Sequence, residues 1–176
     1  MTPTPSATAA PVRPAPSLAT AVAAPAAPRR PVRSALEHAL EHALDADHRL
    51  GTVTALLLVE VADPGTWCPA AAERRMRTAL RAADRWLPLD PGVHAVLLTG
   101  LRPAGAEGTV ERAVDAVLHA LEMWEPAGEG SRVSVSVGAS LAPTRAATAA
   151  EAVRQAAAAL ELARSAGGDC ARISAA

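Results

Sequence analysis

One apolar run limits the folds open to this chain more than any other feature. From Thr52 to Val61 the sequence reads TVTALLLVEV, with an almost unbroken series of apolar residues. A strand with one face in solvent alternates apolar and polar residues, whereas a strand inside a covered sheet can be apolar throughout. The run therefore predicts a strand that is covered on both faces.

Helical and strand-like patterns surround this strand. Ser34 is a candidate N-cap for a preceding helix that ends at Gly51. A second helix is expected over Ala70–Ala83, with small apolar residues on one side and arginines mostly on the other. After it, two short apolar segments joined by Asp90-Pro91-Gly92 predict a β-hairpin, because Pro and Gly suit the positions of a tight turn.

The same alternation continues to the end of the chain. A third helix is expected over Thr109–Met123, and a fourth begins with a capping sequence at Thr148 and ends at Gly167. Between them, valine and serine alternate over 133–137, which is the period of a half-buried strand. A short last strand is expected over Ala171–Ser174. This order predicts an α+β fold with one mixed, largely antiparallel sheet and helices packed on it.

The beginning of the chain has a different composition. Residues 1–29 are mainly Ala, Pro, Thr and Ser, with few branched apolar side chains. Such a segment buries too little surface to offset the entropy lost on ordering. We therefore expect a disordered Pro/Ala-rich tail over 1–29 and one folded domain over 30–176.

Charge and composition argue against several classes of function. The formal net charge of −1 gives no general attraction to nucleic acid or to acidic membrane surfaces. No apolar run is long enough to cross a bilayer, and the N-terminus lacks the pattern of a secretory signal, so a cytoplasmic protein is expected. Cys68 and Cys170 have no metal-ligand spacing and are expected to be reduced and structural.

Three segments resemble one protein family, in the order in which that family has them. SVSVGASLAP, followed by AAEAVRQAAAALELARSAGGDCARI, is similar to the end of a GGDEF domain, the domain of diguanylate cyclases. RAADRWLPLDPGVHAVLL resembles the family's signature hairpin, and ALEHALDADHRLGTVTALLLVEV resembles its first helix and strand. The resemblance covers Arg30 to Ile173 and implies a nucleotide-cyclase-like α+β fold with a ferredoxin-like core.

In that family a dimer condenses two GTP molecules into cyclic di-GMP, with carboxylates that hold divalent metal ions. Carried over to this chain, the signature falls on Asp90, Pro91, Gly92, Val93 and His94. Its two acidic positions are Gly92 and Val93, whose side chains cannot ligate a hard cation. The resemblance thus implies a degenerate domain without cyclase activity or a cofactor, where Mg²⁺ would matter only with residual nucleotide binding.

Other functional positions of the family are retained only in part. Glu60 corresponds to the metal carboxylate of the first strand, and is either a relict ligand or an acid at a strand end that faces water. Arg164 corresponds to a phosphate-contacting Lys and keeps its charge, but the Arg that follows in the family corresponds to Gly168. The loop that recognises guanine is largely deleted.

A possible ligand site remains upstream of the hairpin. Arg81 and Asp84 match the family's RxxD motif, which binds cyclic di-GMP in many members, and Arg112 is a candidate third ligand. Arg grips phosphates through its planar fork, and Asp accepts hydrogen bonds from guanine. The alternative is a surface ion pair at the C-terminal end of a helix.

Other residues with chemical potential have simpler interpretations. His38 and His42, four residues apart, either chelate a metal or form the polar face of a helix. His94 stands where the family has Phe and is expected to fill half-buried space. The tryptophans are expected to be core or dimer anchors rather than platforms for bases: Trp67, Trp86 and Trp124.

The resemblance leaves three functions open. The first is a regulatory domain that senses cyclic di-GMP or a related nucleotide through Arg81 and Asp84. The second is a module without ligand that forms a homodimer or docks a signalling protein. The third is a working cyclase, which the missing acids disfavour.

Overall fold

The computed structural model describes residues 30–62, 69–122, 134–142 and 148–174. The described residues form helices and strands in the expected order. The elements are α1 (Arg30–Leu50), β1 (Val53–Val61), α2 (Pro69–Ala79), β2 (Arg85–Asp90), β3 (Val93–Leu101), α3 (Ala106–Glu122), β4 (Val135–Ala142), α4 (Ala149–Ser165) and β5 (Cys170–Ser174). The expected tail, together with Trp67, Cys68 and Trp124, lies outside these residues.

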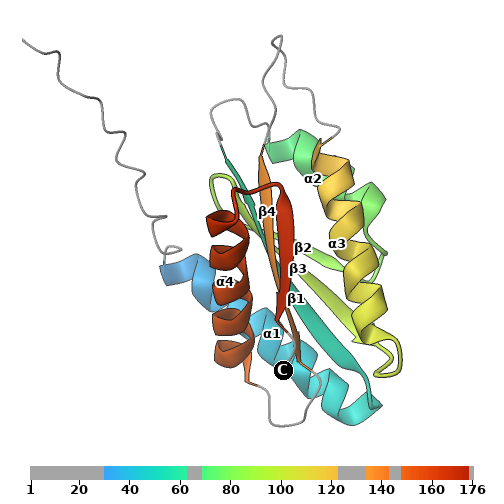
Figure 1. Cartoon of the computed structure of the whole chain (residues 1–176). Coiled ribbons are helices and arrows are strands. Elements are labelled where there is room, and N and C mark those ends of the chain that lie inside the picture. The colour runs from blue at the N-terminus through green and yellow to red at the C-terminus, as the bar shows by residue number, and fades with distance from the viewer. Residues whose placement is uncertain (1–29, 63–68, 123–133, 143–147, 175–176) are drawn as a thin grey trace, which may run out of the picture.

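The strands form one mixed sheet in the order β2-β3-β1-β4-β5. β1 pairs antiparallel with β3 and β4, β2 pairs antiparallel with β3, and β4 pairs parallel with β5. Helices α1 and α4 cover one face of the sheet, and α2 and α3 cover the other (Figure 1). The α+β fold with a mixed, largely antiparallel sheet is therefore confirmed.

The central strand β1 is covered on both faces, as its apolar run predicts. Leu57 and Val59 pack in the core that α2 and α3 share with the sheet. Leu56 and Leu58 point the other way, into the core beneath α1 and α4. Successive side chains of a strand face opposite sides, so both sides must be apolar when both are covered.

Strand β4 differs from the prediction, because every residue in it is buried rather than every second one. The serines face α4, which packs very closely on this strand. Ser140 Oγ donates a hydrogen bond of 2.9 Å to the carbonyl oxygen of Ala152. A Cβ at Gly138 would lie only 2.2 Å from the backbone nitrogen of Leu160. Serine and glycine are thus small residues at a helix contact, and their polarity does not indicate solvent.

Two helix boundaries were predicted wrongly. Helix α1 begins at Arg30 and not after an N-cap at Ser34, because Pro31 is tolerated in a first turn, where its missing N–H would have no partner anyway. Helix α2 ends at Ala79 and not at Ala83. Arg81 and Asp84, the first and last residues of the RxxD motif, therefore lie after the helix and not in its last turn.

Helix α3 begins at Ala106, three residues before the expected Thr109, and the other helix ends agree with the sequence. Gly51 follows α1 with φ of 67°, and its N–H donates to the carbonyl oxygen of Asp47 at 2.8 Å. Thr148 caps α4 by accepting a 3.1 Å hydrogen bond from the N–H of Glu151. Among the described residues, no helix is both long and apolar enough to cross a membrane.

Candidate functional site

The signature hairpin carries no acid at the two positions where the family has its metal-binding acids. Strands β2 and β3 are joined by Pro91 and Gly92, and Gly92 has φ of 77°, a conformation that favours glycine. Val93 pairs directly with Glu60 on β1 and packs against the core under α1 and α4. Asp90 is the last residue of β2 and is half-buried.

Glu60 and Arg164, which the resemblance aligns with a metal carboxylate and a phosphate contact of the family, form an ion pair. Arg164 Nε lies 3.5 Å from Glu60 Oε2, and each side chain is 22% exposed. Arg164 Nη1 also lies 3.0 Å from Glu161 Oε2, so two carboxylates share this guanidinium. The guanidinium that aligns with a phosphate contact is thus held between two carboxylates of the protein, one of which is the acid that aligns with the metal ligand.

This donor set does not fit a divalent cation. Two-metal chemistry needs several carboxylate oxygens around the ions, whereas Glu60 faces an arginine and the side chain opposite it is Val93. Across the described residues, no group of three or more His, Cys, Asp or Glu side chains is placed to hold a metal ion. His38 and His42 lie with ring centroids 6.1 Å apart on the exposed side of α1.

Gly168 stands at the position where the family has a second cation, an arginine, and its surroundings leave no room for an arginine side chain. Its φ is 77°, and a Cβ at this position would lie 2.5 Å from Ser134 Oγ. An arginine would therefore need both a different backbone and a displaced serine.

Arg81 and Asp84 form a closed turn after α2. Asp84 Oδ1 accepts a 2.6 Å hydrogen bond from Arg81 Nη2, and Asp84 Oδ2 accepts from Arg81 Nε at 3.2 Å and from the Arg81 backbone N–H at 3.0 Å. The last of these bonds takes a backbone donor that a longer helix would have used, which accounts for the end of α2 at Ala79. Thr99 on β3 fixes the turn, because its hydroxyl donates to the carbonyl oxygen of Ala83 at 3.1 Å.

The two side chains of this turn differ greatly in exposure. The Asp84 side chain is 2% exposed, whereas the Arg81 side chain is 48% exposed. The bond to Asp84 raises the pKa of Arg81 above its ordinary value. Asp84 therefore holds the guanidinium in one orientation, and the outer N–H groups of Arg81 face the surface.

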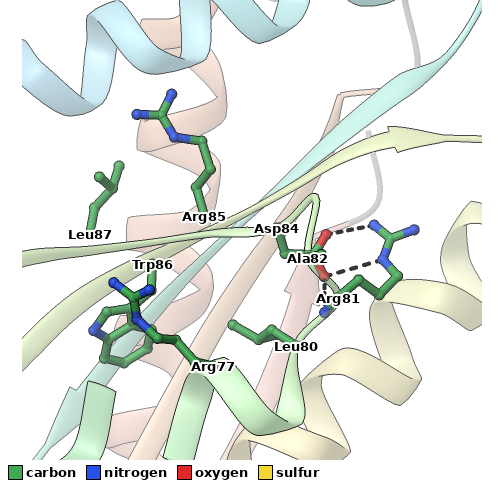
Figure 2. Close-up of a pocket in the computed structure, with 8 residues that line it drawn as sticks. All are labelled: Arg77, Leu80, Arg81, Ala82, Asp84, Arg85, Trp86 and Leu87. Atoms are coloured by element: carbon green, nitrogen blue, oxygen red, sulfur yellow. Dashed lines mark hydrogen bonds and ion pairs between the residues drawn. The ribbon is translucent and has the colours of Figure 1, made fainter. Parts of the chain in front are cut away.

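A surface pocket of about 490 Å³ lies at this turn. The described residues that line it are Arg77, Leu80, Arg81, Ala82, Asp84, Arg85, Trp86 and Leu87. Figure 2 shows Arg77 and Trp86 on one side of β2, with Arg85 and Leu87 pointing to the other side. Three arginines and one aspartate give the pocket wall a net positive charge, which suits an anionic ligand.

Sequence reasoning found two of these residues and missed the others. Trp86 was expected only as an anchor, but it lines the pocket and stacks on His94, with ring centroids 4.4 Å apart and planes inclined by 20°. Burial lowers the pKa of His94 to about 4. The spacing of Arg77, Arg81 and Arg85 by four residues was the available signal of a basic cluster.

Arg112, the candidate third ligand, lies elsewhere, as does His119, for which the sequence predicts no role. Arg112 on α3 donates from Nη2 to Thr109 Oγ1 at 3.0 Å and is not one of the residues that line the pocket. His119 lies on the exposed side of the same helix.

Comparison with solved structures identifies the fold. The GGDEF domain of YfiN (TpbB) from Pseudomonas aeruginosa matches with a TM-score of 0.70 and 22% identity, over 81% of this chain and 94% of that one. An EAL/GGDEF domain protein from M. capsulatus matches with a TM-score of 0.61 and 25% identity, over 76% and 92% of the two chains. The described fold is therefore that of GGDEF domains, as the sequence resemblance implies.

A third similar structure carries a ligand. The GGDEF domain of DgcB from Caulobacter crescentus, in complex with c-di-GMP, has a TM-score of 0.65 and 14% identity, over 81% of this chain and 89% of that one. No protein-family model matches the sequence, and no curated protein matches it either. The likeness therefore lies in the fold.

Proposed function

We propose that this chain is a catalytically inactive GGDEF-like signalling domain that binds cyclic di-GMP or a related nucleotide at the Arg81–Asp84 turn. The observation that carries the proposal is the positively charged pocket of about 490 Å³ at that turn. A volume in this range suits a ligand of nucleotide size. The cyclic di-GMP complex of the DgcB domain, which shares the fold, supports the choice of ligand.

The proposed inactivity rests on the donor groups at the other end of the hairpin. Phosphoryl chemistry on GTP requires cations near the triphosphate and carboxylates that hold them. Here Glu60 is paired with Arg164, and Gly92 and Val93 supply no side-chain oxygen. A domain that keeps the fold but not these groups retains surfaces and pockets for regulation.

In the proposed complex, Arg81 binds a phosphate of the ligand. Asp84 is almost completely buried and already accepts three hydrogen bonds from Arg81, so we assign it the role of orienting the guanidinium. A pre-oriented guanidinium loses less side-chain entropy when it binds an anion, which favours affinity.

Isothermal titration calorimetry with cyclic di-GMP tests the proposal. We expect measurable heat of binding to the full chain, and an affinity about tenfold lower or worse in Arg81→Ala, since a hydrogen bond to a charged group contributes about 1.5–3 kcal/mol. Arg74→Ala is the matched control, because Arg74 is an exposed arginine on α2 that does not line the pocket.

The absence of heat at high ligand concentration would exclude this function. Equal losses of affinity in Arg81→Ala and Arg74→Ala would also contradict it, because they would indicate a general charge effect instead of a site.

A further inference from the structure

Trp86 has one face covered by protein and lies at the wall of the pocket. Its indole stacks on the imidazole of His94, with centroids 4.4 Å apart. It is partly buried against the core under α2 and α3, and it also lines the pocket. An aromatic ring whose first face is held by a neighbour is a rigid platform for a second planar group.

The position of this platform is fixed by the sheet. Trp86 pairs with Val96 across β2 and β3, and His94 lies two residues before Val96 on the same face. His94 is only 3% exposed, so it cannot swing into solvent and release the indole. Diagonal neighbours on one face of an antiparallel pair are within reach of aromatic side chains.

Arg77 brings a second cation to the same side of β2 as Trp86 (Figure 2). Its guanidinium is 74% exposed and pairs with Glu73 at 2.7 Å, one turn earlier on α2. An exposed pair of this kind contributes little stability, so a phosphate can displace the carboxylate at small cost. Arg85 also lines the pocket but points to the opposite side of the strand, as Figure 2 shows.

We propose that the pocket takes a purine nucleotide whose base stacks on the indole face of Trp86 that His94 leaves uncovered, and whose phosphate beside this base is bound by Arg77. The inference rests on the proposed function and adds to it the residues that select the base. Stacking on an aromatic side chain favours purines over pyrimidines because a purine offers the larger ring system.

Calorimetry with cyclic di-GMP and with cyclic di-UMP tests the role of Trp86. We expect Trp86→Leu to bind cyclic di-GMP about tenfold more weakly and Trp86→Phe to recover part of that loss, since stacking contributes about 1–3 kcal/mol per base. The unchanged chain should bind cyclic di-UMP more weakly than cyclic di-GMP, because uracil offers the indole a smaller ring than guanine does. Circular dichroism of each variant establishes that the fold is retained.

Fluorescence gives a second measurement, for which no residue of the pocket is substituted. In the double variant Trp67→Phe/Trp124→Phe, Trp86 is the only tryptophan of the chain. Cyclic di-GMP should quench its emission with the same dissociation constant that calorimetry gives, because a stacked base contacts the indole directly.

Variants of Arg77 and Glu73 test the phosphate contact. Arg77→Ala should weaken binding of cyclic di-GMP, with Arg74→Ala as the matched control that leaves it unchanged, because Arg74 lies on the same helix and does not line the pocket. Glu73→Gln should bind about twofold more tightly, because it removes the competitor that holds Arg77. A merely structural role of Arg77 would not produce tighter binding in Glu73→Gln.

The outcomes separate this inference from the proposed function. If the unchanged chain binds no cyclic di-GMP, both are wrong. If it binds and Arg81→Ala weakens binding, but Trp86→Leu binds equally well and the emission of Trp86 does not change, the inference is wrong and the proposed function stands.

Discussion

At the scale of single residues, His94 shows how a polar side chain can serve the core. It stands where the family has Phe, and it is stacked on Trp86 and 3% exposed. Burial disfavours the charged imidazolium, which lowers its pKa from 6.5 to about 4. The ring is therefore neutral at neutral pH and fills the space of an aromatic side chain, as the sequence predicts.

This pKa gives a prediction for stability. Because the folded-state pKa lies below the unfolded value, the unfolded chain takes up the proton first, and His94 costs the fold about 3 kcal/mol between pH 7 and pH 4. His94→Phe should lose less of its free energy of unfolding over this range than the unchanged chain. Urea unfolding at both pH values measures the difference, and equal losses would contradict the assignment.

At the scale of elements, the contact between β4 and α4 depends on Gly138. A Cβ there would lie 2.2 Å from Leu160 N and 2.3 Å from Ala156 O, both of which are backbone atoms that cannot rotate away. The two elements must then separate, or the helix must shift along the strand.

Gly138→Ala should therefore lower the free energy of unfolding by about 3 kcal/mol or more. Gly108→Ala is the matched control, since its Cβ would meet only Arg112 Nη1 at 3.5 Å, an ordinary contact. That control should be neutral or slightly stabilising, because alanine favours a helix over glycine. Denaturant titration of the two variants decides the matter, and similar stability in both would show that the close packing is not required.

The elements also show what the sequence could and could not predict. Their order and the β-hairpin follow from periodicity and turn residues, which are local. The burial of both faces of β4 depends on α4, and the end of α2 depends on the Asp84 carboxylate taking the N–H of Arg81. The pocket forms because the turn between α2 and β2 brings Arg77 and Trp86 to the same wall. No residue spacing within a single element indicates this arrangement.

At the scale of the whole molecule, the pocket and the signature hairpin turn lie at opposite ends of β2. The pocket lies at the first residues of β2. The hairpin turn, which lies near Glu60, follows the last residue of β2. Leu87 is the last residue of β2 that lines the pocket, so three residues of extended chain, Pro88 to Asp90, separate the pocket from the turn by about 10 Å. Sites this far apart, without shared partners, are expected to behave independently.

Incubation with GTP and Mg²⁺ or Mn²⁺ should yield no cyclic di-GMP, because Gly92 and Val93 supply no carboxylate. Since the two regions are separate, the proposed pocket should still bind cyclic di-GMP. Glu60→Ala should leave the affinity for cyclic di-GMP unchanged within about twofold. Chromatography of the reaction and calorimetry of the variant measure the two effects. Turnover that Glu60→Ala abolishes would overturn the proposed inactivity.

The pocket has one more property that matters beyond this chain. The lining residues that the structure describes all belong to the segment 77–87. Most of such a site can be transplanted as one stretch, although His94, which stacks on Trp86, and Thr99, which fixes the turn, lie outside it. Grafting segment 77–87 together with His94 and Thr99 onto a GGDEF domain with another RxxD turn should thus transfer the proposed ligand preference.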